Sequence, residues 1–226
     1  MQYELAGGQF PVVICQLAEG EQIIAEGGSM AWQTPNMKME TQGGGIGKLF
    51  SRALSGENLF RNTFTAEGGP GTIAFGSSFP GKILPMQIKP GKEMILQKRS
   101  FLAGEAGIDV EVVFNKKLST GIFGGEGFIM QKIFGEGLVF VEIDGELIEY
   151  ELKPGQQLVV DTGNVAGFEN TVQMEIKQVP GLKNKFLGGE GLFNTVLTGP
   201  GKVFLQTMPI YNMAMALRPF FPTGNA

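Results

Sequence analysis

The sequence predicts an all-β protein built from three tandem copies of one short unit. Glycine accounts for 35 of the 226 residues, about twice the usual share of roughly 7%, which indicates many tight turns. A turn signal recurs three times at nearly constant spacing. Most segments between these turns alternate apolar and polar residues, as strands with one buried face do. Helical periodicity appears in only two places.

The repeated turn signal has an aliphatic residue three places before a glycine and two apolar residues three and four places after it. It occurs around Gly20, Gly91 and Gly155, in LAEGEQII, IKPGKEMI and LKPGQQLV. Proline precedes the glycine in two copies. This pair suits the centre of a type II turn, because proline fixes the first φ and glycine accepts the positive second φ. Each copy therefore predicts a turn followed by a strand.

Two further markers follow each turn in the same order. A glutamate in a glycine-rich stretch stands 37, 35 and 35 residues after the turn glycine, and a Gly-x-Gly pair then opens an apolar run in GPGTIAF, GEGLVFV and GPGKVFL. Three ordered markers predict one unit of 64 to 71 residues. We place the repeats at residues 1–80, 81–148 and 149–208, with a C-terminal tail at 209–226, in one compact triplicated domain.

Strand signals dominate these units. IDVEVVF and TVQMEI show the alternation of half-buried strands. LVFVEIDGELIEYEL alternates about Asp144 and Gly145, a strong hairpin signal, and places three apolar residues on one face: Val139, Val141 and Ile143. We expect short helices near residues 48–55 and 211–217.

The sequence contains no histidine and one cysteine. Histidine is the commonest general base and the usual nitrogen ligand for zinc. We therefore expect no enzymatic activity, no catalytic residue and no cofactor or metal cluster, although carboxylates or lysines can serve some enzymes. Cys15 stands in the apolar run PVVICQL, which predicts a small buried strand residue.

The charge balance bears on partners and location. A net charge of −4 and a pI near 5.1 argue against nucleic acid, since phosphate neutralisation needs clustered Lys and Arg. A local basic patch stays open. The N-terminal MQYELAGGQF lacks the pattern of a secretory signal, and no apolar run approaches 18 residues. We expect a cytoplasmic protein.

Several segments resemble the altered-inheritance-of-mitochondria protein 24 family, which occurs in bacteria and in mitochondria. They are GGGIGKLFSRALSGENLFRNTF, FGGEGFIMQK and GLKNKFLGGEGLFNTVLTGPGKVFLQT, and the similarity extends from YELAGGQFPVV to ALRPFFP. The resemblance implies a bacterial member in which each repeat is similar to a subunit of the tryptophan RNA-binding attenuation protein, a short double-stranded β-helix or barrel-like unit. It also implies a homotrimer, in which three chains of three repeats form a nine-unit ring. Mitochondrial relatives are linked to inner-membrane organisation, whereas bacterial members have no assigned reaction.

The glutamates of the second marker, Glu57, Glu126 and Glu190, are candidate site residues. In equivalent repeats they would form a rim of carboxylates, which suits Ca²⁺ or Mg²⁺. Alternatively, each accepts hydrogen bonds from turn amides or faces water. A phosphate site is not favoured, because the central carboxylate of GGEG would repel the anion.

Near the tail, flexible and aromatic side chains suggest a contact surface, either on the body of the chain or at a subunit interface: Met208, Met213, Met215, Phe220 and Phe221. We expect Trp32 in the core and Lys98 with Arg99 on solvated surface. Membrane contact is expected to be weak or absent, since the glycine-rich loop near residues 46–50 has few flanking cations.

Two functional classes remain open. The first is a non-enzymatic ring-forming assembly or scaffold protein with an unknown protein partner, related to membrane or organelle organisation in the mitochondrial relatives. The second, by analogy with the attenuation protein, is a ring that binds a small molecule or RNA. No basic series recurs in all three repeats, so the residues themselves do not support the RNA role.

Overall fold

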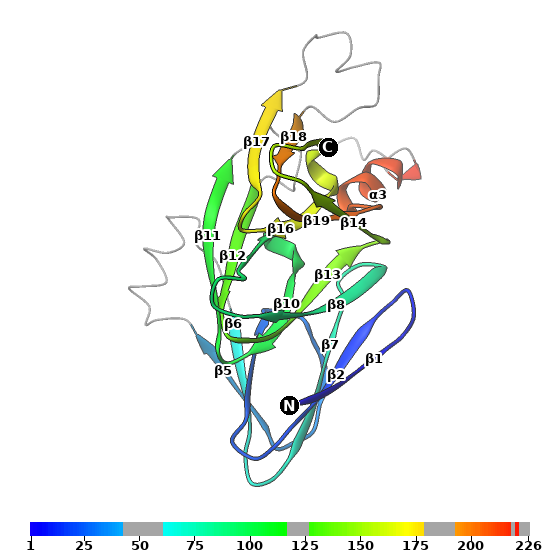
Figure 1. Cartoon of the computed structure of the whole chain (residues 1–226). Coiled ribbons are helices and arrows are strands. Elements are labelled where there is room, and N and C mark those ends of the chain that lie inside the picture. Colours follow the sequence, from blue (N-terminus) through cyan, green and yellow to red (C-terminus); the bar gives the residue numbers. More distant parts are fainter. Residues whose placement is uncertain (43–60, 117–126, 179–192, 218–219, 222–226) are drawn as a thin grey trace, which may run out of the picture.

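The computed structural model describes residues 1–42, 61–116, 127–178, 193–217 and 220–221. These residues form strands β1 to β19, two short 3₁₀ helices and the helix α3 (Ile210–Leu217), as Figure 1 shows. The expected all-β class is confirmed. The expected C-terminal helix is confirmed by α3, whereas the helix expected near 48–55 lies outside the described residues.

The strands form four antiparallel sheets. The first has the order β1 (Gln2–Ala6), β2 (Val12–Leu17), β7 (Gly71–Gly76), β4 (Met30–Gln33). The second has the order β5 (Met37–Gln42), β6 (Arg61–Ala66), β3 (Gln22–Glu26), β10 (Phe101–Glu105), β13 (Gly137–Asp144), β8 (Gly81–Ile88). The third has the order β11 (Ile108–Lys116), β12 (Phe128–Gly135), β9 (Met94–Gln97), β16 (Val165–Glu169), β19 (Gly201–Gln206), β14 (Leu147–Leu152). The fourth has the order β15 (Gln157–Asp161), β18 (Phe193–Thr198), β17 (Gln173–Gln178).

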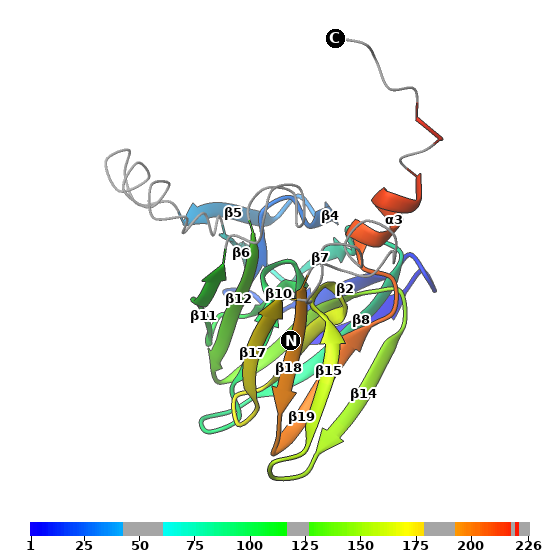
Figure 2. The same cartoon turned by 90° about the horizontal axis from the view of Figure 1, so that it is seen from above.

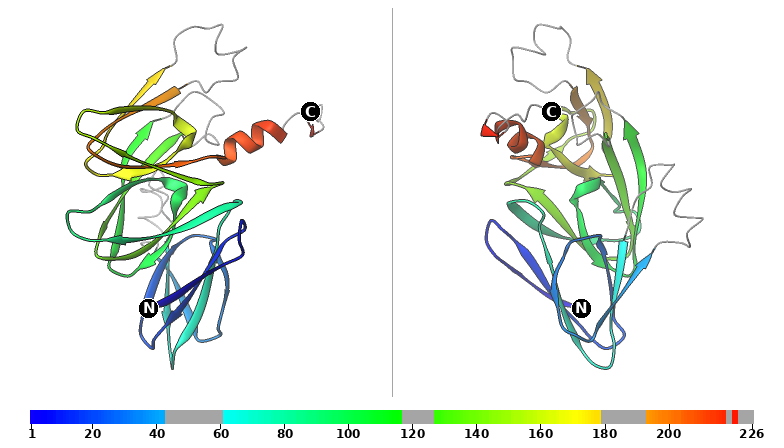
Figure 3. Two further views of the ribbon diagram at one scale, coloured as in Figure 1. Left: turned by 45° about the vertical axis from the view of Figure 1, so that its right-hand side comes forward. Right: turned by 180° about the vertical axis from the view of Figure 1, so that it is seen from behind.

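The sheets stack as successive layers, with a hydrophobic cluster between each neighbouring pair. Phe75 and Phe140 belong to the cluster between the first and second sheets. Ile24 and Ile133 belong to the cluster between the second and third, and Phe128 and Leu197 to the one between the third and fourth. Figure 3 shows the layers following chain order from one end of the molecule to the other. Each inner sheet therefore buries both of its faces.

The second and third sheets are each made of two three-stranded halves. The halves of the second sheet join where β3 pairs with β10, with Ala25 opposite Ala103. The halves of the third join where β9 pairs with β16, with Leu96 opposite Gly167. The fourth sheet is a single half, and so is the first apart from the added strand β1.

The three predicted turns are confirmed. Gly20, Gly91 and Gly155 have φ of 79°, 80° and 74°. In each turn the residue after the glycine donates its N–H to the carbonyl two places before the glycine, at 2.9 to 3.0 Å. Positive φ carries no steric penalty at glycine. Strands β3, β9 and β15 begin two or three residues later. The triplication and its boundaries at residues 80, 148 and 208 stay predictions.

Two sequence expectations are wrong. Asp144 and Gly145 do not close a hairpin, because β13 pairs within the second sheet while β14 pairs with β19 in the third. The chain crosses between layers at this turn. Trp32 is 52% exposed, because β4 lies at a sheet edge with one neighbour, β7.

Other core expectations are confirmed. Cys15 is buried. Val139, Val141 and Ile143 share one face of β13 and pack in the cluster between the second and third sheets. The segment IDVEVVF lies in β11, and QMEI of the segment TVQMEI lies in β17, which begins at Gln173.

Candidate functional site

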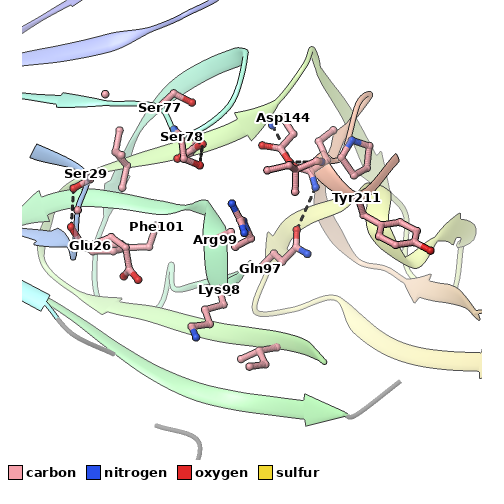
Figure 4. A pocket seen from close by; sticks show the side chains of 18 of the residues that line it. Glu26, Ser29, Ser77, Ser78, Gln97, Lys98, Arg99, Phe101, Asp144 and Tyr211 are labelled. Atoms are coloured by element: carbon pink, nitrogen blue, oxygen red, sulfur yellow. Dashed lines mark hydrogen bonds between the residues drawn. The ribbon is translucent and has the colours of Figure 1, made fainter. Parts of the chain in front are cut away.

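A cavity of about 1150 Å³ opens where the ends of several strands meet α3. Its lining comes from the turn between β3 and β4, the 3₁₀ helix η1 (Lys98–Ser100) between β9 and β10, the ends of β13 and β19, and α3. Figure 4 shows these side chains from close by. Segments distant in sequence thus form one recess, with both charged and apolar walls.

Two cations line this cavity. Lys98 and Arg99 form most of η1. Arg99 is exposed, as expected, but it points into the recess toward the side that carries Ser78 and Asp144, whereas Lys98 points to the other side (Figure 4). The open surface predicted for this pair is therefore a concave one.

A buried carboxylate faces the same cavity from β13. Glu142 is 6% exposed, and its Oε1 accepts hydrogen bonds from the backbone N–H of Ser78 at 2.8 Å and from the Ser78 hydroxyl at 2.6 Å. Burial raises the pKa of Glu142, and the hydrogen bonds from Ser78 and Ser77 oppose that rise. The contact ties the segment after β7 to the end of β13.

Asp144, two residues further along, holds the start of α3. Its Oδ2 accepts a hydrogen bond from the N–H of Ile210 at 2.8 Å. Burial raises the pKa of Asp144, while the Ile210 N–H and the positive charge of Arg99 oppose the rise. An N–H at a helix start lacks an intrahelical acceptor, so the carboxylate satisfies it from another strand.

Hydrogen bonds of the Gln206 side chain connect the cavity residues beside Asp144. The Nε2 of Gln206 donates to Oε1 of Gln97 at 3.2 Å and to the carbonyl of Gly163 at 2.9 Å. Its Oε1 accepts from the N–H of Asp144 at 3.2 Å. The Gln206 side chain is therefore satisfied on both ends while only 4% exposed.

The second candidate surface is a pair of strand edges, one at each end of the layered stack. On β4, Met30 and Trp32 are 39% and 52% exposed, and on β15 Val159 is 62% exposed. Beside β4, Phe10, Trp32 and Phe79 contribute to a hollow of about 580 Å³. An exposed apolar edge offers backbone groups and side chains to another strand.

The site residues predicted from the sequence have different outcomes. Glu57, Glu126 and Glu190 lie outside the described residues. Within the residues that the structure describes, no group of three or more His, Cys, Asp or Glu could hold a metal ion. The tail residues all lie after β19: Met208, Met215, Phe220 and Phe221 are exposed, and Met213 is half-buried.

Met215 and Phe221 also line the cavity, so part of the predicted contact segment contributes to a recess. Sequence reasoning missed Glu142, Asp144 and Gln206. A signal for Glu142 was present, because it is a carboxylate inside the apolar run LVFVEI. Gln206 carries no such signal, since its role depends on strands that meet only in the fold.

Comparisons with known proteins identify relatives along nearly the whole chain. The family model described as mitochondrial biogenesis AIM24 matches residues 3–208. An uncharacterized protein of Streptococcus pyogenes serotype M6 is 28% identical over 229 residues, which cover 96% of this chain and 89% of the relative.

The crystal structure of a Streptococcus pyogenes protein superposes with a TM-score of 0.80 at 22% identity, covering 97% of this chain and 99% of that one. The likeness shows the fold. Among the described residues, no helix has the length and apolar character needed to cross a membrane.

Proposed function

The chain belongs to the mitochondrial biogenesis AIM24 family, and we propose that it is a non-enzymatic protein that assembles into a closed ring of identical subunits. The proposal rests on one observation about the sheets. Each inner sheet consists of two halves joined edge to edge, whereas among the described strands the first and fourth sheets each lack the joining partner. A fourth sheet from one copy and a first sheet from another would complete each other.

The two unjoined edges occupy matching places in the strand order. In the inner sheets, β3 joins β10 and β9 joins β16. By the same order, β15 would join β4 of a second copy, giving a sheet that runs β17, β18, β15, then β4, β7, β2, β1. The two inner sheets end in edge strands, which are β5 and β8 in the second sheet and β11 and β14 in the third. Among the described strands, β4 and β15 are edges where their counterparts in the inner sheets are joined.

The side chains on these strands support the same pairing. Ile24, four residues after Gly20, is 7% exposed and packs between the second and third sheets. Ile95, four residues after Gly91, packs against the cluster between the third and fourth sheets. Val159, four residues after Gly155, is 62% exposed. Covering an apolar side chain of this size stabilises an interface by about 1.5 to 3 kcal/mol.

The inner junctions also predict the register. Ile24 lies opposite Gly104, and Ile95 lies opposite Phe168. Gly104 directly follows Ala103, the first residue after the irregularity in the pairing of β10 with β13, and Phe168 directly follows Gly167, the first residue after the irregularity in the pairing of β16 with β19. In β4 the corresponding residue after the irregularity is Trp32, and Gln33 directly follows it. Transferred to β4, this rule places Val159 opposite Gln33 and Val160 opposite Trp32 of the second copy. The edges would then join antiparallel.

Three copies per ring is the number that the family resemblance implies, and it would give nine units in closed cyclic symmetry. The absence of histidine from the sequence supports the non-enzymatic part of the proposal. A net charge of −4 disfavours RNA as the partner. We therefore propose a scaffold whose outer surface binds another protein.

A cross-link tests the seam. Residues directly opposite on paired strands are close enough for a disulfide, so the double variant Gln33→Cys with Val159→Cys should form covalent dimers and closed trimers on oxidation. The matched control, Gln33→Cys with Val113→Cys, keeps one partner on β4 and moves the other to β11. A double variant that stays monomeric on a non-reducing gel, or a control that links equally well, would contradict the seam.

A further inference from the structure

We propose that the cavity binds an organic anion with an apolar body and a single carboxylate, held by the guanidinium of Arg99. This inference goes beyond ring assembly, because every group it uses lies within one chain. It begins from the side chain of Arg99, which points into the recess (Figure 4).

Within the described parts of the chain, no protein group holds the guanidinium of Arg99 at close range. There, its side chain makes no hydrogen bond or salt bridge, and its interaction with Asp144 is a longer-range attraction of charges. A guanidinium presents a rigid fork of donors that matches a carboxylate with two parallel hydrogen bonds. A ligand carboxylate would fill that geometry.

The fold does not require an arginine at this place. The connection between β3 and β4 has Gly28 at the corresponding position, and the connection between β15 and β16 has Gly163. Both connections turn without a side chain there. Arg99 therefore occurs in only one of these three connections, and the geometry of the turn does not require an arginine there.

Three carboxyl groups line the cavity, Glu26, Glu142 and Asp144, and the two on the side of Arg99 are turned toward protein donors. Glu142 turns its Oε1 to the two donors of Ser78, and Asp144 turns its Oδ2 to the N–H of Ile210. Burial raises the pKa of both groups, which weakens their repulsion of an anion. A phosphate with two charges would meet more repulsion than a carboxylate, so a single charge fits better.

Apolar side chains among the remaining lining residues set the nature of the ligand body, beside polar ones that include Glu26 and Lys98. Phe101 on β10 is buried beside the recess, and Ile129 lies on β12 of the third sheet. The helix α3 contributes Ile210 and Met215, and Phe221 follows it. Ligand sites combine mostly apolar walls with a few placed polar groups, in volumes of about 300 to 1,000 Å³. A cavity of about 1150 Å³ accommodates a medium-length chain or a ring system.

Titration calorimetry with decanoate tests the site. We expect saturable binding to the wild-type chain, and binding at least tenfold weaker to Arg99→Gln, because one charge-assisted hydrogen-bonded pair is lost. Decanol, which has the same chain without the charge, should also bind at least tenfold more weakly. The matched control Lys92→Gln removes an exposed cation outside the cavity and should leave the affinity unchanged.

A second variant guards against a folding defect at Arg99. Ala214 lines the cavity from α3 and is exposed, so Ala214→Trp should fill the recess and abolish binding while Arg99 stays intact. Wild-type protein that gives no saturable heat would overturn the proposal. So would equal affinity in Arg99→Gln, in Ala214→Trp or for decanol. Light scattering on the same samples reports assembly separately, so a failed ring and an empty cavity are distinguishable.

Discussion

Ile24 and Val159 occupy the same position in their strands, four residues after a turn glycine, yet Ile24 is 7% exposed and Val159 is 62% exposed. The difference has a direct cause in the layers. Ile24 packs between the second and third sheets, whereas no further sheet of the described chain covers the face of the fourth sheet that carries Val159. If a second copy joins the edge of β15, the second sheet of that copy would cover this face and bury Val159 in the same way. The proposed ring therefore rests on a local mismatch between corresponding strands.

A charge at that position should dissociate the ring. Val159→Lys would bury an unpaired ammonium in the seam, and such burial costs several kcal/mol. We expect the mass measured by light scattering to fall to that of one chain, while circular dichroism shows that the chain stays folded, with a lower melting temperature because the assembly no longer stabilises it. Val113, which is 46% exposed on the edge strand β11, provides the control. Val113→Lys should keep the full mass, and dissociation by both variants would argue against a specific seam.

The close approach of β16 and β9 predicts a stability effect at Gly167. A Cβ there would lie 2.5 Å from Cδ2 of Leu96 and 2.7 Å from the carbonyl oxygen of Ile95, so the strands would have to move apart. Gly167→Ala should lower the free energy of unfolding in urea by about 1 to 3 kcal/mol.

Gly104→Ala is the matched control on β10, because its Cβ would meet nothing nearer than 3.4 Å. We expect this substitution to cost clearly less than Gly167→Ala. Equal losses in the two variants would mean that the strand contact at Gly167 does not limit stability.

The thiol of Cys15 should be unreactive in the folded protein. Cys15 is buried in the cluster between the first and second sheets, and burial raises its pKa to about 12. Since the thiolate is the reactive species, a thiol reagent at pH 8 should label Cys15 only after unfolding in urea. Rapid labelling in native buffer, with near-complete reaction before any loss of structure, would contradict this burial.

Glu142 predicts a pH dependence of stability with a definite sign. Burial raises its pKa above the ordinary value of 4.5, so the ionised form is the less favourable one in the fold. Its contribution to stability is present below that value and is lost as the pH rises through the raised pKa. Glu142→Gln should therefore gain stability relative to wild type as the pH increases.

Urea unfolding of both proteins at pH 5 and at pH 8 checks this sign. The difference in free energy of unfolding should favour Glu142→Gln more strongly at pH 8. A difference that is constant with pH would mean that the hydrogen bonds from Ser78 balance burial, and a difference that moves toward the wild type would mean that they outweigh it; either result would contradict the expected sign.

The features that the sequence predicted well are local ones. The turns at Gly20, Gly91 and Gly155 depend on four consecutive residues, and a positive φ at glycine decides them. Buried Cys15 follows from an apolar run. The hairpin at Asp144 and Gly145 was wrong because the local signal shows only that the chain turns, while strand pairing depends on partners far away. Gln206, the residue next to that turn in space, is 62 residues from Asp144.

Nonlocal contacts also explain the cavity and Trp32. Arg99, Glu142 and Ile210 come from three separate segments, so no spacing in the sequence relates them. A tryptophan is most often a core residue, but Trp32 lies on a strand whose second neighbour is missing within one chain. Its exposure is understandable only from the order of strands in the first sheet.

Light scattering on the purified wild-type protein tests the ring most directly. A single chain has a mass of 24.3 kDa. For the proposed ring we expect one species near three times that mass, unchanged on dilution across the micromolar range. A species at 24.3 kDa would contradict it, because the edges of β4 and β15 would then be unjoined in solution.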